Sequence, residues 1–176
     1  MLVSLTHSLD ATEIALVARI AAASDRHGLT RIAKIATRLG NGSLYPLLIL
    51  FLIAVRVEDA IRFAFSAAVS LAVAHILYPL LKRSIGRLRP CDYDPSLARD
   101  IEPMDHYSCP SGHAMTAAAF GVPLAMTHLP AALLALAIWA AISWSRVALG
   151  HHYVSDVVAG TILGAGVAGT VLVWIA

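Results

Sequence analysis

Long apolar stretches, separated by short charged clusters, make up most of the chain after residue 42. About 20 helical residues span the hydrocarbon core of a bilayer, so a charge-free stretch of that length predicts a membrane-spanning helix. Such stretches cover 43–55, 63–81, 114–145 and 157–176. The third is long enough for a helical hairpin, with its turn expected near His128 to Pro130. The pattern predicts an all-α polytopic helix bundle with five membrane-spanning helices, forming one domain over 43–176.

The first 42 residues follow a different pattern, because charges interrupt every apolar run before it can cross a bilayer. Asp10 followed by Glu13 is typical of a capping box at a helix start. Over 31–39, apolar residues recur on one helix face and basic residues on another. These basic residues are Arg31, Lys34 and Arg38. We interpret 1–42 as amphipathic helices, lying on the membrane surface or packed on the protein. Insertion of 9–23 would make a sixth span.

Composition supports a membrane protein and excludes other classes. Of the 176 residues, 59% are hydrophobic and 14% charged, against roughly 25% charged in soluble domains. The mean hydropathy is +0.74. A net charge of +2 does not favour a nucleic-acid partner. Cys91 and Cys109 are too few for a disulfide framework and lack Cys-x-x-Cys spacing, although one bridge between them is conceivable. No basic segment precedes an apolar run at the N-terminus, so we expect no cleaved leader.

The order of the spans places two polar segments on one side of the membrane. The segment 82–113 follows the second span, and 146–156 follows the second arm of the hairpin. One complete hairpin separates them, so we expect their side chains to meet. In the last span, Gly160 and Gly164 form a Gly-x-x-x-Gly motif, which allows close helix packing in lipid.

Three short motifs lie at the ends of these spans. They are Lys82-x6-Arg89-Pro90, Pro110-Ser111-Gly112-His113 and Ser145-Arg146-x5-His152-x3-Asp156. In this order and spacing they resemble the signature of the type 2 phosphatidic acid phosphatase (PAP2) superfamily. The resemblance covers roughly 82–156. It implies a membrane-embedded lipid phosphate phosphatase that works through a phosphohistidine.

The residue types suit phosphate chemistry. A phosphate monoester carries nearly two negative charges, which cations must neutralise before a nucleophile can attack. Lys82, Arg89 and Arg146 supply three cations, and arginine can donate to two oxygens at once. Ser111 and Gly112 form a turn whose hydroxyl and backbone N–H groups can approach the same anion. We predict these five residues as the phosphate-binding set.

Two histidines are candidates for the chemical steps. If 152 and 156 lie on one helix, Asp156 can accept a hydrogen bond from one ring nitrogen of His152 and leave the other nucleophilic. His151 would pair instead with Ser155, a poorer partner. The alkoxide leaving group needs a proton, and His113 is the best general acid, in agreement with the role that the resemblance implies.

We expect neither a metal nor another cofactor, because the cations replace a metal ion and no His, Asp or Glu cluster has ligand spacing. Each motif alone has an ordinary explanation. Basic residues after an apolar span are often interfacial anchors, Ser111 could be a plain helix cap, and His152 with Asp156 a local pair. The shared spacing template argues against these explanations together. The acidic residues of the long loop are expected to be solvated, and His75 to be a neutral buried histidine. The acidic residues are Asp92, Asp94, Asp100, Glu102 and Asp105.

The expected localisation is a bacterial inner membrane, crossed several times. Basic residues outside the motifs make the side that carries the motifs the more basic one, which places it in the cytoplasm by the positive-inside rule. A site where spans meet the interface suits a substrate with its phosphate in the headgroup layer. We therefore expect a lipid or polyprenyl phosphate as the partner. Candidates include phosphatidic acid, phosphatidylglycerol phosphate, undecaprenyl pyrophosphate and decaprenylphosphoryl phosphoribose.

Four alternatives remain compatible with these sequence features. A lipid phosphotransferase would pass the phosphoryl group to an alcohol, and an undecaprenyl pyrophosphate phosphatase would cleave an anhydride. A vanadate-dependent haloperoxidase resembles the same constellation, but such enzymes look soluble and larger. A membrane scaffold or transporter would not need His152 for its function.

Overall fold

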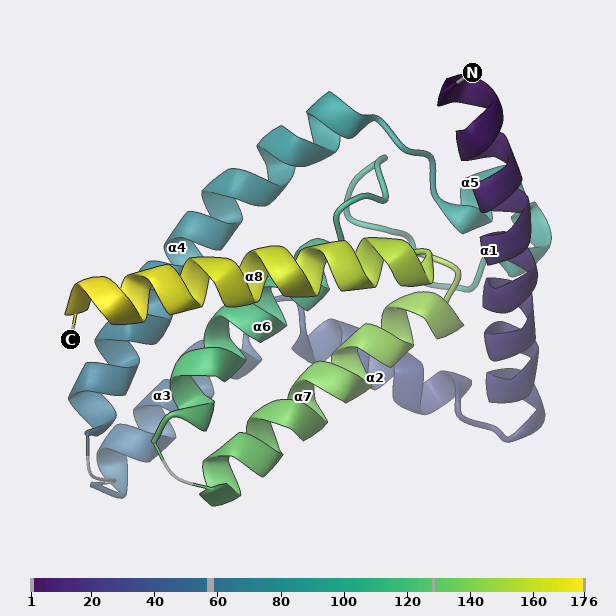
Figure 1. The fold of residues 1–176 in the computed structure, drawn as a ribbon. Coiled ribbons are helices and arrows are strands. Elements are labelled where there is room, and N and C mark those ends of the chain that lie inside the picture. Colours follow the sequence, from purple (N-terminus) through teal and green to yellow (C-terminus); the bar gives the residue numbers. More distant parts are fainter. Residues whose placement is uncertain (1, 57–58, 128, 176) are drawn as a thin grey trace.

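The computed structural model describes the backbone of residues 2–56, 59–127 and 129–175, and the side chains of 12–56, 59–127 and 130–175. The described chain is helical and contains no β-strand in these ranges (Figure 1). The elements are α1 (Leu2–Arg26), α2 (Thr30–Leu39), α3 (Leu44–Ala54), α4 (Ala60–Ile85), α5 (Pro90–Tyr93), the 3-10 helix η1 (Pro95–Leu97), α6 (Gly112–Ala125), α7 (Leu129–Ala148) and α8 (Val154–Ile175). The all-α prediction is therefore confirmed for the described residues.

Helix α6 is the centre of the bundle. It packs against α4, α7 and α8, and nearly all its residues are buried. Gly160 and Gly164 of α8 lie directly against the α6 backbone, where an added Cβ would collide with the carbonyl oxygens of Ser111 and Met115. The Gly-x-x-x-Gly prediction is thus confirmed, since these glycines let α8 approach the first turn of α6.

The helices occur where spans were predicted, but the predicted count of five is not reached. Within the described residues, three segments are long and apolar enough to cross a membrane: Ala60–Tyr93, Pro130–Ala148 and Val154–Ile175. A fourth is possible if α2 and α3, bent by 68°, form one broken span. Helix α6 has 14 residues and is enclosed by other helices, so it is too short to be a full span. Its hairpin with α7 turns between Ala125 and Leu129 as expected, although His128 lies outside the described residues.

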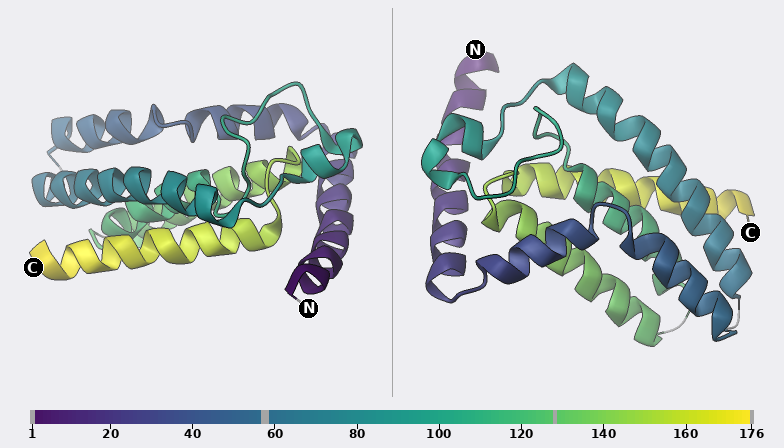
Figure 2. Two further views of the ribbon diagram at one scale, coloured as in Figure 1. Left: turned by 90° about the horizontal axis from the view of Figure 1, so that it is seen from above. Right: turned by 180° about the vertical axis from the view of Figure 1, so that it is seen from behind.

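The N-terminal helix differs from its prediction. Helix α1 begins at Leu2, so Asp10 lies within it and the predicted capping box is wrong as a helix start. The side chain of Asp10 lies outside the described residues. Helix α1 is not among the candidate spans and lies across one end of the bundle, against α7 and α2 (Figures 1 and 2). A sixth span is therefore not found in the described chain.

Helix α2 packs on the protein through its small residues and leaves its larger apolar side chains exposed. Ala33, Ala36 and Thr37 are buried and α2 contacts α7, because small residues allow the helices to come close. Ile32 and Ile35 remain more than half exposed. The structure therefore supports packing on the bundle, and contact of the outward-facing isoleucines with a membrane surface stays a prediction.

Candidate active site

The first motif lies where α4 ends. Lys82 is in the last turn of α4 and its side chain is buried. Gly86 follows with a φ of 66°, a left-handed conformation that glycine adopts without strain and that ends the helix. The chain then turns back, so that Arg89, which precedes the short helix α5, is buried beside Lys82.

The second motif forms the start of α6. Ser111 is the N-cap of this helix, and its hydroxyl accepts a hydrogen bond from the N–H of Ala114 at 3.4 Å. The backbone N–H of Ser111 donates to the carbonyl oxygen of Asp156 at 2.9 Å, which ties α6 to α8. His113 is the second residue of α6, and its Nε2 is 2.7 Å from Oδ1 of Asn41, which follows α2.

The third motif spans the turn between α7 and α8. Arg146 is buried in the last turn of α7 and donates to the hydroxyl of Thr37 in α2. Its carbonyl oxygen accepts from the N–H groups of both His151 and His152, at 3.0 and 3.1 Å. The N–H of Cys91 donates to the carbonyl oxygen of Gly150 at 3.0 Å, so the two polar segments meet as the order of the spans predicted.

These segments enclose one cavity of about 170 Å³. Six of the predicted residues line it: Lys82, Arg89, Gly112, His113, Arg146 and His152. Ser111 and Asp156 lie immediately behind it, joined to each other through the backbone. The structure therefore brings all eight predicted residues together. The cavity extends along α4 past Tyr78 to His75, which is exposed rather than buried as we predicted.

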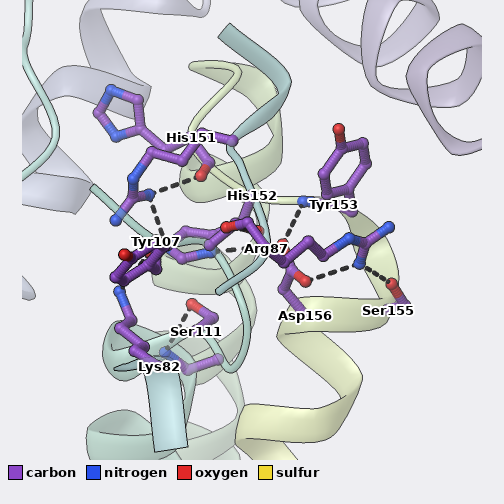
Figure 3. A network of polar contacts seen from close by, with 12 residues as sticks. Lys82, Arg87, Tyr107, Ser111, His151, His152, Tyr153, Ser155 and Asp156 are labelled. Carbon is purple, nitrogen blue, oxygen red and sulfur yellow. Dashed lines mark hydrogen bonds and ion pairs between the residues drawn. The ribbon is translucent and has the colours of Figure 1, made fainter. Parts of the chain in front are cut away.

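His152 does not pair with Asp156 in the predicted way. Helix α8 begins at Val154, so His152 lies before the helix rather than one turn along it. Its Nδ1 is 3.6 Å from Oδ2 of Asp156, longer than a hydrogen bond. The reason is that Asp156 has other partners: Oδ2 accepts from the N–H of Tyr153 at 2.9 Å, and Oδ1 accepts from Arg87 at 2.7 Å. Figure 3 shows His152 between these groups and the side chains around Lys82.

The opposite ring nitrogen of His152 faces the cations. Its Nε2 is 3.2 Å from NH1 of Arg89. Burial, together with the positive charges of Arg89 and Arg146, holds the pKa of His152 well below its ordinary value. The imidazole is therefore neutral near pH 7, which is the form that can act as a nucleophile. Burial and the charge of Arg146 likewise lower the pKa of His151 to about 3, but its Nε2 is held by the carbonyl oxygen of Ile101 and not by Ser155.

Asp105 belongs to the site, contrary to the expectation that the loop acids are solvated. Nζ of Lys82 donates to both its carboxylate oxygens at 2.8 Å, and NH2 of Arg89 donates to Oδ1 at 2.5 Å. Partial burial opposes ionisation, but these cations outweigh it and hold the pKa of Asp105 below its ordinary value. We call Lys82, Arg89, Arg146 and Asp105 the cavity cluster.

A second charged group lies behind His152, and sequence reasoning missed most of it. Arg87 donates to Asp156 and to the hydroxyl of Ser155, both at 2.7 Å, and to Glu13 of α1 at 2.6 Å. Glu13 also accepts from the backbone N–H of Ser155 at 3.0 Å, which caps the start of α8. Burial alone would raise the pKa of Glu13, but the hydrogen bonds from Arg87 and Ser155 hold it below its ordinary value. We call Glu13, Arg87, Ser155 and Asp156 the rear cluster.

Sequence signals for the missed residues were weak. Glu13 is four residues before Val17, which is fully buried, so it is an acidic residue on the buried face of α1. Arg87 lies inside the first motif, at one of the six positions whose residue the motif does not specify. Nothing in the spacing of the loop distinguishes Asp105 from its acidic neighbours. The conceivable bridge is not formed, since Cys91 and Cys109 are both free thiols.

The described residues include no group of three His, Cys, Asp or Glu side chains able to hold a metal ion. They do include buried donors without a hydrogen-bond partner among the described residues. Nε of Arg146, Nδ1 of His151 and Nδ1 of His152 are such atoms. A buried guanidinium with an unpaired N–H in a cavity wall is suited to an anionic ligand.

Comparison with known proteins gives consistent matches. The sequence profile of the PAP2 superfamily matches residues 63–176. The chain is 33% identical over 164 residues to decaprenylphosphoryl-5-phosphoribose phosphatase of Mycobacterium tuberculosis, covering 89% of this chain and 86% of that protein. It is 38% identical over 96 residues to lipid A 1-phosphatase of Rhizobium johnstonii, covering 51% of this chain and 38% of that protein.

Two solved structures share the fold. LpxE of Aquifex aeolicus has a TM-score of 0.68 at 22% identity, covering 82% of this chain and 85% of that one. A transmembrane PAP2 type phosphatidylglycerolphosphate phosphatase of Bacillus subtilis has a TM-score of 0.57 at 23% identity, covering 94% of each chain.

Proposed function

Because this chain belongs to the PAP2 superfamily, we propose that it is a membrane phosphatase that hydrolyses a lipid or polyprenyl phosphate monoester through a phosphohistidine at His152. The observation that carries the proposal is the convergence of Lys82, Arg89 and Arg146 with two histidines on one small cavity. Three cations face one carboxylate, that of Asp105, in this cavity, and an excess of buried positive charge is unfavourable unless a further anion binds there.

The cations bind the phosphoryl group. Lys82 and Arg89 approach from the end of α4, and Arg146 from the end of α7. The N-terminus of α6 adds backbone N–H groups beside Gly112, and a helix start favours negative charge. Together they would neutralise the phosphoryl oxygens and hold them in line for attack.

His152 then attacks phosphorus with Nε2. A P–N bond forms as the P–O bond to the lipid alcohol breaks, and the proton on Nδ1 remains on the ring beside Asp156. The rear cluster fixes Asp156, so the imidazole keeps its orientation. His113 protonates the leaving oxygen, and a bound phosphate would favour the protonated form that this role requires. Water, deprotonated by His113, then breaks the P–N bond and releases inorganic phosphate.

The substrate is proposed to be a phosphate carried on a membrane lipid. The cavity runs along α4 from Lys82 to the exposed His75, so a lipid tail could leave it along the surface of this helix. The match to the decaprenylphosphoryl-5-phosphoribose phosphatase extends over most of both chains, and this similarity favours a polyprenyl-linked monoester as the substrate. A polyprenyl diphosphate is the alternative candidate substrate, because this chain is also 34% identical over 106 residues to an undecaprenyl-diphosphatase of Sulfolobus acidocaldarius, covering 58% of this chain and 50% of that protein.

The test is phosphate release from lipid and polyprenyl mono- and diphosphates in detergent, with and without a metal chelator. We expect turnover of at least one monoester, no loss with chelator, and loss of activity in His152→Ala and His113→Ala. His27→Ala, which alters an exposed histidine at the end of α1, is the matched control. Turnover in His152→Ala, or loss on chelation, would contradict the mechanism. Transfer of phosphate to an added alcohol would indicate a phosphotransferase.

We also propose that the protein lies in a bacterial inner membrane and that its cavity faces the cytoplasm, because the positive-inside rule places the more basic side there. The natural Cys109 is a poor target for testing accessibility from one side of the membrane. Burial and the nearby Asp156 carboxylate raise its pKa to about 11, so little of the reactive thiolate is present. Exposed Glu102, near the cavity, and exposed Met126, at the far end of α6, are better positions. In a chain without Cys91 and Cys109, Glu102→Cys should react with an impermeant maleimide only in opened cells, and Met126→Cys in intact ones. The reverse pattern would place the site outside.

A further inference from the structure

The Asp105 carboxylate is paired with two of the three cations that the proposed function assigns to the phosphoryl group, Lys82 and Arg89. A lysine ammonium has three N–H donors. In Lys82, two of them go to the carboxylate oxygens of Asp105 at 2.8 Å and the third to the carbonyl oxygen of Tyr107 at 2.9 Å. While Asp105 is in place, Lys82 therefore has no donor for a ligand.

Arg89 is held by the same residue. Its NH2 donates to Oδ1 of Asp105 at 2.5 Å, and its Nε donates to the backbone oxygen of Asp105 at 2.8 Å. Its NH1 is committed to the carbonyl oxygen of His151 at 2.6 Å and faces His152. The carboxylate thus makes the charge-assisted contacts that an arginine and a lysine would offer to a phosphate.

Asp105 is also the member of the cavity cluster that is able to leave. Its side chain is 39% exposed, against 5% for Lys82 and 2% for Arg89. It lies in the segment 98–110, which has no helix or strand. By contrast, Lys82 lies in the last turn of α4 and Arg89 directly before α5, and each also donates to at least one backbone carbonyl oxygen. A rotation of one side chain in an irregular loop would expose both cations.

We propose that Asp105 is an intramolecular competitor of the phosphoryl group, which the substrate must displace. The proposal rests on the proposed function and deepens it. Competition reduces the apparent affinity of every phosphate by the fraction of molecules in which the site is open. A lipid phosphate retains further binding energy from its tail, whereas inorganic phosphate has none. Asp105 therefore weakens both ligands by the same factor, so that a substrate with additional binding energy from its tail still occupies the site while the inorganic phosphate product is released more readily.

The experiment measures binding of inorganic phosphate by calorimetry and its inhibition of turnover, using the full chain in detergent. Asp105→Asn and Asp105→Ser both remove the competing charge, and either one suffices if the other fails to fold. We expect phosphate to bind about tenfold more tightly to these variants, with a lower KM for a water-soluble phosphate monoester. Asp100→Asn is the matched control, because Asp100 lies in the same loop but is exposed and pairs with Lys34, outside the cavity, at 2.7 Å.

The direction in which phosphate affinity changes on removal of the Asp105 charge distinguishes competition from positioning. If Asp105 only positions Lys82 and Arg89, its removal should weaken phosphate binding and lower kcat. Weaker or unchanged phosphate binding in both variants would therefore overturn the proposal. The proposed function fails separately, if the wild-type chain releases phosphate from no lipid substrate. Calorimetric binding of phosphate requires no turnover, so the two failures can be distinguished.

Discussion

The cavity cluster and the rear cluster lie on opposite sides of His152. Both contain arginine and carboxylate side chains, but they differ in the ratio of cations to carboxylates. The cavity cluster has three cations and one partly exposed carboxylate. The rear cluster has one cation, Arg87, between two carboxylates, and the side chain of Asp156 is fully buried. An excess of cations around an exchangeable anion suits ligand binding, whereas a closed set of paired charges suits positioning. The difference separates residues that would bind substrate from residues that hold the nucleophile in place.

The largest effect is expected from Arg89→Ala in the cavity cluster. A guanidinium that stabilises a phosphoryl transition state is worth about 10³-fold or more in rate. We expect kcat/KM for the best lipid phosphate to fall by that order, with a smaller effect on unfolding than any break in the rear cluster. Phosphate release and chemical unfolding in detergent micelles measure the two quantities. A stability loss as large as the activity loss would abolish the distinction between the clusters.

Arg87→Leu should have the opposite profile. It leaves the buried Asp156 carboxylate and Glu13 without their shared cation, and breaking a buried ion pair lowers the free energy of unfolding by about 3 kcal/mol. Activity should fall as well, because Asp156 no longer has a fixed position beside His152. Arg83→Leu removes an exposed cation from the same end of α4 and is the control. Equal stability of the two variants would show that the rear cluster does not hold the fold.

Glu13→Gln should have a smaller effect, because the amide keeps the shape and one acceptor. A hydrogen bond to a charged partner contributes about 1.5 kcal/mol, so we expect a loss of that order in the free energy of unfolding. The backbone N–H of Ser155 also loses a carboxylate partner, which should reduce kcat several-fold while KM is nearly unchanged. A change confined to KM would place Glu13 in substrate binding instead.

The smallest effect is the pH dependence of the Glu13 contribution. The pKa of Glu13 is lower in the folded protein than its ordinary value of 4.5. The unfolded chain therefore binds more protons in this range, and the stabilisation is complete above pH 4.5 and lost as the pH falls through the folded pKa. The difference in unfolding free energy between wild type and Glu13→Gln should shrink accordingly in acid. A difference that persists unchanged at low pH would show that the charge of Glu13 is not its source.

The spacing of the motifs predicted much of the site but not its internal contacts. Lys82, Arg89, Arg146 and the two histidines were predicted from the spacing of three motifs, which resembles the PAP2 signature. The order of the spans predicted that these motifs meet on one side of the membrane. The pairing of His152 with Asp156 was predicted on a helix that in fact begins two residues later. Helix boundaries depend on capping contacts, here the bond from Tyr153 N–H to Asp156 and the bond from Ser155 N–H to Glu13, and spacing does not reveal these.

The helical class, the positions of the apolar helices and the close approach at Gly160 and Gly164 could be predicted from local periodicity, small residues and the length of apolar runs. The residues that gather at one end of the bundle could be predicted from motif spacing. By contrast, the three-dimensional fold was needed to show that α6 is enclosed, that Glu13 of α1 contacts Arg87, and that Asp105 pairs with Lys82 and Arg89. Each of these depends on contacts between residues far apart in the chain, where a charged side chain finds a partner that no local pattern encodes.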